Sequence, residues 1–190
     1  GDTVLLRRGD VFREAAEFRE DAADRLTFGA YGPPDAPRPV ISGAVAVTGW
    51  KPYRDGIYRA SVDVPIRHLF VDGKLMTIAR YPNTGWLRVI DWGDADDGRN
   101  TFITCPELTG NPRNAPGYWN GAQIRWRRWS WWHETRRVVG DDGQGALTLA
   151  GARRRAERDP FWTGFYLDNK LSELDAPGEW YFDPDSRTVY

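Results

Sequence analysis

Leu26-Thr27-Phe28-Gly29-Ala30-Tyr31 is a short run of apolar and aromatic residues, and the turn residues Gly32-Pro33-Pro34 follow it directly. The same arrangement recurs at Pro39-Val40-Ile41-Ser42-Gly43 and again at Val45-Ala46-Val47. Short strands that are separated by glycine and proline turns at intervals of roughly ten residues are typical of all-β proteins. The sequence therefore predicts an all-β fold.

Longer, alternating strands are expected after residue 50. Gly56 to Val62 alternates apolar and polar residues, which is the two-residue period of a half-buried strand. Residues 68–71 and 74–79 flank Asp72-Gly73, and they predict a β-hairpin because Asp-Gly supplies the positive φ angles of a type I′ turn. Ala122 to Val139 reads as one long β segment rich in tryptophan and arginine. Together these strands predict a β-sandwich or barrel-like module.

Composition narrows the classes of function. The 190 residues carry a formal net charge of -1, which gives no overall attraction to nucleic acid or to an anionic membrane. No apolar run approaches the roughly 20 residues that span a bilayer. Cys105 is the single cysteine, and the two histidines, His68 and His133, form no zinc-binding motif, so we expect no metal and no cofactor. Ten tryptophans, eight tyrosines and eight phenylalanines predict either an aromatic-rich β core or an aromatic binding surface.

Both ends of the sequence read as interrupted structure. Residues 1–10 open at once on a turn and a strand, and residues 179–190 form a hairpin whose second strand has only begun. Natural domains usually lose order toward their termini. We therefore expect this sequence to be a piece of a longer protein.

Several strings resemble those of one protein family. Three of them resemble the first coil of pectin-lyase-like right-handed parallel β-helix proteins, namely residues 1–14, 26–32 and 38–43. Three more resemble a β-rich module that is inserted near the N-terminus of large secreted members of that group: Leu69-Phe70-Val71-Asp72-Gly73, Ala79-Arg80-Tyr81-Pro82-Asn83 and residues 174–183. The resemblance implies a β-helix-like coil at 1–43, an inserted β-rich module at 44–180 and the start of a return into the β-helix at 181–190.

The resemblance also implies a function for the parent protein. It is expected to bind and cleave polysaccharide, as a glycoside hydrolase or a polysaccharide lyase, and to be secreted or periplasmic in bacteria, with a signal peptide outside this sequence. In that family the catalytic groups generally lie on later coils, so no catalytic residue is assigned here and these 190 residues alone are expected to be inactive. The expected partners are a polysaccharide or oligosaccharide, uronate-containing ones included, and the remainder of the parent chain.

The most distinctive local feature is residues 125–134, which read RWRRWSWWHE. Aromatic rings on a rigid sheet can stack on a sugar ring, and adjacent arginines can hydrogen-bond hydroxyls or clamp uronate carboxylates. If the segment is extended, alternate side chains share a face. The candidate carbohydrate-binding residues are Trp126, Arg127, Trp129, Trp131, Trp132, Tyr118 and Trp119. The alternative is that these rings pack the core of a sheet while arginines cover their edges.

Two functions therefore stay open at this point. The module either binds carbohydrate and shapes the substrate site, or it is a structural cap on the β-helix without a ligand of its own, because an open coil end exposes strand edges and apolar core. Weaker alternatives rest on single segments. The acidic loop Asp94 to Asp97 lacks the spacing of a calcium-binding EF-hand. Arg153-Arg154-Arg155 with Arg158 raises nucleic-acid binding, against which the balanced charge stands.

Overall fold

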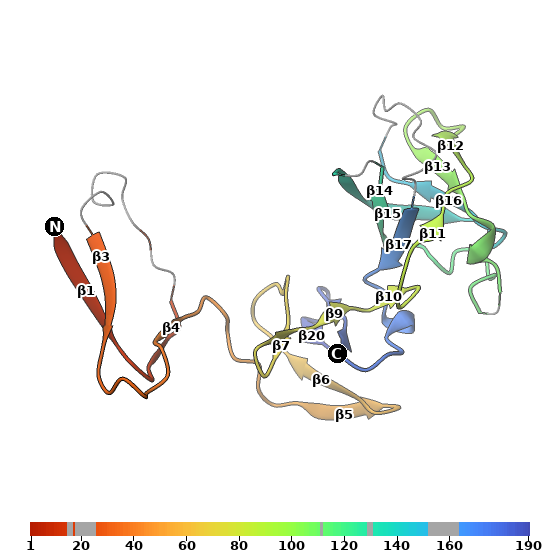
Figure 1. Cartoon of the computed structure of the whole chain (residues 1–190). Helices are drawn as coiled ribbons and strands as arrows, with labels where there is room; N and C mark the ends of the chain where they lie inside the picture. The colour runs from red at the N-terminus through yellow and green to blue at the C-terminus, as the bar shows by residue number, and fades with distance from the viewer. Residues whose placement is uncertain (15–16, 18–25, 111, 129–130, 152–163) are drawn as a thin grey trace. The chain divides into compact units, whose positions relative to one another are not determined.

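The computed structural model is built from β-strands and turns. It describes residues 1–14, 17, 26–110, 112–128, 131–151 and 164–190. Within these ranges, helical structure is limited to two 3-10 turns, η1 (Pro106–Leu108) and η2 (Leu171–Glu173), so the predicted all-β fold is confirmed. The chain divides into two compact units, Gly1–Gly49 and Trp50–Tyr190 (Figure 1). The boundaries expected after residues 43 and 180 stay predictions.

The first unit contains two pairs of parallel strands. Strand β1 (Asp2–Arg7) pairs with β3 (Leu26–Tyr31), and β2 (Val11–Phe12) pairs with β4 (Val40–Ile41). The first two strands, β1 and β2, are therefore followed by two more, β3 and β4, and each later strand lies parallel to its earlier counterpart. None of the described residues of this unit is buried. Two stacked turns give each strand a single neighbour, which is too little to enclose an apolar core.

The second unit opens with an antiparallel sheet. Its strand order is β19 (Phe182–Asp183), β20 (Thr188–Val189), β6 (Ile57–Ser61) and β5 (Lys51–Arg54). The final strands of the chain therefore pair with β6, and the expectation that residues 181–190 begin a return into a β-helix stays a prediction. The remaining short strands are the hairpin β7 (Phe70–Val71) with β8 (Lys74–Leu75) and the parallel pair β9 (Thr77–Ile78) with β18 (Glu179–Trp180).

The Asp72-Gly73 turn confirms one prediction made from turn chemistry. Asp72 has a φ of 49° and Gly73 a φ of 75°, and Phe70 and Val71 face Leu75 and Lys74 across an antiparallel pair. The positive φ angles that the Asp-Gly dipeptide predicts are thus present. Only the first two residues of the expected return strand belong to this hairpin, because Thr77 and Ile78 pair in parallel with β18 instead.

An eight-stranded antiparallel sheet forms most of the second unit. Its strands are β10 (Arg80–Tyr81), β11 (Leu87–Arg88), β12 (Asp91–Asp94), β13 (Thr101–Thr104), β14 (Gln123–Arg127), β15 (His133–Asp141), β16 (Ala146–Leu149) and β17 (Gly164–Asp168). The order is β10-β17-β14-β15-β16-β13-β12, and β11 also pairs with β17. Residues 89 and 90 alone connect β11 at one edge to β12 at the other, so the sheet is strongly curved. It does not close into a barrel.

The concave face of this sheet encloses the core. Alternate residues of β14 and β17 point inward, and Ile124, Trp126, Phe165 and Leu167 have no exposed surface. The Trp126 ring meets the Trp92 ring edge to face, with 5.7 Å between the centroids and 81° between the planes. Edge-to-face packing of this kind adds to the burial of apolar area.

The segment at residues 122–139 corrects an expectation. It is not one long strand but a hairpin, in which Trp126 lies opposite Glu134 and Arg127 lies opposite His133. The Arg128 amide donates to the Trp132 carbonyl oxygen at 3.1 Å and closes the turn. Folding back satisfies the backbone groups of β14 and leaves Trp126 in the core, whereas one extended strand would leave them to be paired elsewhere.

Gly145 provides a test of how tightly the sheet packs. Its φ is +99°, and a Cβ atom there would lie 2.5 Å from the Cys105 carbonyl oxygen, whereas Gly98 has a φ of +61° and open space around it. Gly98→Ala should lower the free energy of unfolding by about 1 kcal/mol through backbone strain alone. Gly145→Ala should cost about 3 kcal/mol, because the clash adds to the strain. Equal losses in urea denaturation would show that the contact can relax without cost.

The single cysteine provides a second test. Cys105 has no exposed surface, and burial raises the pKa of its thiol to about 11. The thiolate is the reactive form, so at pH 8 the native chain should not react with a disulfide reagent such as Ellman's reagent. One thiol per chain should react after denaturation. Rapid reaction of the native chain would mean that β13 opens readily.

Candidate functional site

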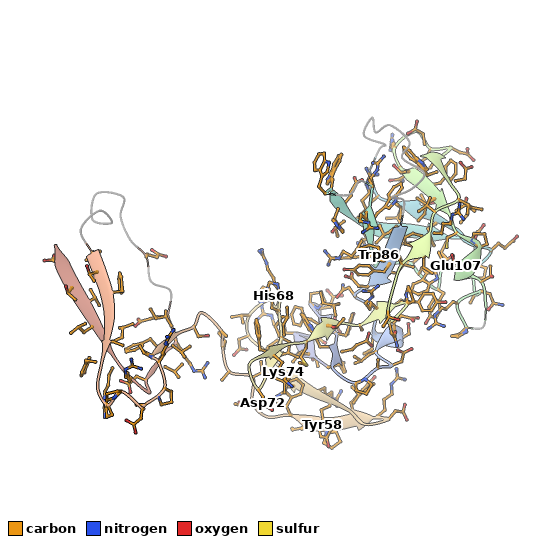
Figure 2. All side chains as sticks on the ribbon, viewed as in Figure 1. Tyr58, His68, Asp72, Lys74, Trp86 and Glu107 are labelled. Carbon is orange, nitrogen blue, oxygen red and sulfur yellow. The ribbon has the colours of Figure 1, made fainter. Side chains whose placement is uncertain are left out.

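An aromatic and cationic surface lies on the solvent side of the eight-stranded sheet. We call the side chains of Arg80, Trp86, Arg127, His133 and Tyr166 the outer face. Trp86 lies 5.2 Å from Tyr166 and 5.7 Å from His133 between ring centroids. Trp86 is 40% exposed, and its position against the sheet can be followed in Figure 2. Gly164 permits this position, because a Cβ atom there would lie 3.2 Å from the Trp86 Cβ atom.

Arginine side chains cover the rings of the outer face. The Arg80 guanidinium carbon lies 3.7 Å from the Tyr166 ring centroid, and that of Arg127 lies 5.1 Å from the Trp86 ring centroid. The Arg80 Nε donates to the Pro82 carbonyl oxygen at 2.9 Å and its Nη2 to the Gly85 carbonyl oxygen at 2.6 Å. These bonds fix the guanidinium flat against the tyrosine, in a cation–π arrangement.

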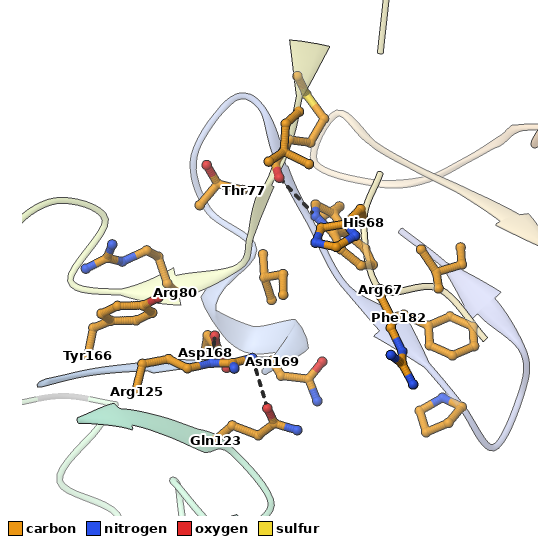
Figure 3. Close-up of a pocket in the computed structure, with 16 residues that line it drawn as sticks. Arg67, His68, Thr77, Arg80, Gln123, Arg125, Tyr166, Asp168, Asn169 and Phe182 are labelled. Atoms are coloured by element: carbon orange, nitrogen blue, oxygen red, sulfur yellow. Dashed lines mark hydrogen bonds and ion pairs between the residues drawn. The ribbon is translucent and has the colours of Figure 1, made fainter. Parts of the chain in front are cut away.

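One end of the outer face continues into a cavity of about 640 Å³. Tyr166, Arg80 and Arg125 line the cavity on the side of the sheet, and Figure 3 shows Arg80 stacked over Tyr166 with Arg125 beside Asp168. Residues 66–68 and 75–78 line it from other segments, together with Trp180 and Phe182. The volume is within the range of small-molecule binding sites, and the lining combines apolar rings with several polar groups.

Asp168 is a buried carboxylate in this cavity. The residue is 3% exposed, and its Oδ2 accepts a hydrogen bond from the Arg125 Nε at 2.7 Å. Its Oδ1 is buried and accepts no hydrogen bond from any residue that the structure describes. Burial raises the pKa of the carboxyl group, while the positive charges of Arg125 and Arg80 act in the opposite direction.

Arg125 is held by three partners on the same surface. Besides the Asp168 bond, its Nη1 donates to the Thr135 hydroxyl at 3.0 Å and its Nη2 to the Gln123 Oε1 at 3.1 Å. The planar guanidinium presents its donors in fixed directions, so this set of acceptors fixes its orientation. Arg125 therefore positions the Asp168 carboxylate rather than offering a free fork to a ligand.

A second buried carboxylate lies away from the cavity. Glu173 is 1% exposed. Its Oε2 accepts hydrogen bonds from the Arg113 Nε at 3.2 Å and Nη2 at 2.7 Å, and its Oε1 accepts a hydrogen bond from the Tyr118 hydroxyl. Burial and the bond to Glu173 raise the pKa of Tyr118. Both carboxylate oxygens of Glu173 are thus paired within the protein, which is typical of a structural network.

The predicted candidates lie in different surroundings. Trp126 and Trp119 have no exposed surface and pack in the core, so their rings are not accessible to a ligand. Tyr118 is half-buried against Trp119, at 5.0 Å between centroids. Arg127 lies on the outer face. Trp129 lies outside the described residues, as does the arginine run at 153–158.

Trp131 and Trp132 lie at the tip of the β14–β15 hairpin. Trp131 is 79% exposed, and the two rings stack with 6.5 Å between centroids and 19° between planes. They form a stacked aromatic pair in which Trp131 is exposed and Trp132 is half-buried, and their role in binding stays a prediction. The other residues of the outer face and the cavity were not predicted as site residues. The sequence indicates them in two ways. Tyr166 and Asp168 alternate with the apolar residues Phe165 and Leu167, and the turn residue Gly85 stands next to Trp86.

The described residues contain neither a metal-binding cluster nor a membrane-spanning helix. Among the described residues, no three His, Cys, Asp or Glu side chains lie close enough together to hold a metal ion. No helix in the described ranges is long and apolar enough to cross a membrane.

The fold resembles that of one solved structure, which is described as a glycoside hydrolase. The TM-score is 0.69 at 20% sequence identity, and the match covers 98% of this chain and 35% of that chain. The chain thus spans about a third of the length of the structure that it matches. At this identity the likeness shows a shared fold. No family model and no curated protein matches the sequence.

The Arg125–Asp168 ion pair yields a prediction on stability. Arg125→Met should lower the free energy of unfolding by about 2 kcal/mol, because it leaves a buried carboxylate without its partner. Adding Asp168→Asn should recover part of that loss, since the unpaired charge is then removed. The four chains of the double-mutant cycle can be compared by urea denaturation. Strictly additive losses would mean that the pair contributes nothing as a pair.

Proposed function

We propose that this chain is a non-catalytic part of a secreted or periplasmic polysaccharide-degrading enzyme of the parallel β-helix type, a glycoside hydrolase or a polysaccharide lyase. In this proposal the first unit belongs to the β-helix, and the second unit binds carbohydrate and shapes the substrate site. The single observation that carries the binding role is the outer face, on which the exposed Trp86 ring lies against Tyr166, and Tyr166 and Arg80 line a cavity.

The chemistry of the outer face suits carbohydrate. A sugar ring has an apolar C–H face that stacks on an aromatic ring and hydroxyl groups that bond to polar side chains at its edge. Trp86, which is 40% exposed, offers a ring, and His133 and Arg127 place polar groups beside it. Trp131 and Trp132 offer a further stacked pair at the tip of the neighbouring hairpin.

The β-helix assignment of the first unit rests on its pairing. Both strand pairs of this unit are parallel, which is the pairing of successive coils in a parallel β-helix. Its strands also expose apolar side chains, with Leu5 and Val11 54% and 53% exposed. A further coil stacked on these strands would cover them. The likeness to a glycoside hydrolase structure is consistent with this assignment.

Structural capping is the second candidate function. It is favoured by the burial of Trp126 and Trp119, which are two of the rings that the sequence offers for binding. It requires no ligand on the outer face. The two functions therefore differ in one measurable property, which is the binding of sugar by the folded chain.

Titration of the chain with neutral and uronic-acid oligosaccharides tests the binding role. We expect a saturable change in tryptophan fluorescence with one sugar class and at least tenfold weaker binding by Trp86→Ala, equal to about 1.4 kcal/mol. Trp50→Ala is the matched control, because Trp50 is 39% exposed, against 40% for Trp86, and lies outside the outer face. Trp131→Ala tests the hairpin tip separately. A folded chain that binds none of the sugars would favour the cap.

A further inference from the structure

Within the described part of the chain, the fold provides a hydrogen-bond donor for only one of the two carboxylate oxygens of Asp168. The residue lines the cavity, and its Oδ1 is buried and has no hydrogen-bond donor among the described residues, although its Oδ2 is bonded to Arg125. An ionised carboxylate only accepts hydrogen bonds, and a buried acceptor without a donor is costly. A group that enters the cavity and donates a hydrogen bond would satisfy this atom.

The charges around the cavity restrict what that group can be. Arg67, Arg80 and Arg125 all line it, and Asp168 is the single acidic residue in the lining. The surplus of positive charge disfavours a cationic ligand. A hydroxyl group is then the donor that suits Oδ1.

The arginines of the sheet side are poorly placed to clamp a ligand carboxylate. Three of the five N–H groups of the Arg125 guanidinium, one on each nitrogen, already donate to protein oxygens on Asp168, Thr135 and Gln123, which hold the group in a fixed orientation. The Nε and Nη2 of Arg80 donate to backbone carbonyl oxygens, and its flat face covers Tyr166. A bidentate fork needs two free, parallel donors. A negatively charged group beside Asp168 would also be repelled by the Asp168 carboxylate.

We infer that the cavity is a subsite for one neutral, hydroxyl-bearing sugar ring, with Asp168 Oδ1 accepting a hydrogen bond from a ring hydroxyl. The inference rests on the proposed carbohydrate-binding function and names the class of sugar within it. Tyr166 and Arg80 belong to both the outer face and the cavity wall, so a glycan that lies along the outer face reaches the cavity without a break. Trp180 and Phe182 supply apolar walls for the ring.

Asp168→Asn tests the hydrogen bond with little change of shape. Because the Arg125 Nε is a donor, the carboxamide should turn its oxygen toward Arg125 and its NH2 group toward the cavity. The cavity-facing acceptor becomes a donor. We expect methyl hexopyranosides and neutral oligosaccharides to bind at least tenfold more weakly in calorimetric titrations of the whole chain. Glu173→Gln is the matched control, since it also replaces a buried, arginine-paired carboxylate but lies outside the cavity, and it should leave sugar binding unchanged.

Thr77→Trp provides a test that leaves Asp168 and Arg125 intact. Thr77 is exposed and lines the cavity, so a large side chain there should fill the subsite and abolish this part of the binding. Thermal unfolding confirms that each variant is folded. Loss of binding by both variants, with uronates bound more weakly than the matching hexosides, supports the inference.

The possible failures are distinguishable. Oligosaccharide binding that depends on Trp86 but is unchanged by Asp168→Asn and Thr77→Trp would overturn the subsite and leave the proposed function standing. Preferential binding of hexuronates that Thr77→Trp abolishes would overturn the assignment to neutral sugars. If no sugar binds to the folded chain, the proposed function fails and the inference fails with it.

Discussion

The pairing of β14 with β17 is the constraint on which the second unit depends. Ile124 lies opposite Leu167 and Trp126 opposite Phe165, so the two-residue period of both strands directs four large side chains into one core. The same register places Arg125 beside Tyr166, and Gln123 beside Asp168, on the opposite surface. A shift by one residue would exchange the two sets and expose the core. The core and the candidate site are therefore fixed by one register.

Arginine side chains in the eight-stranded sheet donate hydrogen bonds to protein oxygens from different parts of the chain. Arg136 bonds to Glu134 through Nε, to Thr101 through Nη1 and to the Gly151 carbonyl oxygen through Nη1, while Arg128 bonds to Glu134 from the other side. A guanidinium has five donors in fixed directions and satisfies several acceptors at once, which a lysine cannot do with the same geometry. Part of the abundance of arginine in the sequence thus reflects internal hydrogen bonding in the described part of the sheet. It is a weaker sign of anion binding than the sequence suggests.

The sequence predicted features that depend on local chemistry and missed those that depend on pairing. The all-β class and the Asp72-Gly73 turn follow from turn residues and alternation, which act over a few positions. No glycine or proline lies between β14 and β15 to indicate that the chain reverses, so the sequence predicts one strand there. Whether Trp126 or Trp131 is buried depends on which strands lie beside β14. The outer face brings together residues 86, 133 and 166, and only the pairing of β11, β17, β14 and β15 makes them neighbours.

The proposed stacking of a further coil and the proposed binding of carbohydrate make different physical demands. Stacking depends on apolar side chains that another coil can cover, and the first unit exposes such side chains on β1 and β2. Binding depends on rings and hydrogen-bonding groups fixed before the ligand arrives, as Trp86, Arg80 and Asp168 are in the second unit. The residues named for these two demands lie in different units of the chain. Sequence changes in one unit can therefore alter one property while the other is kept.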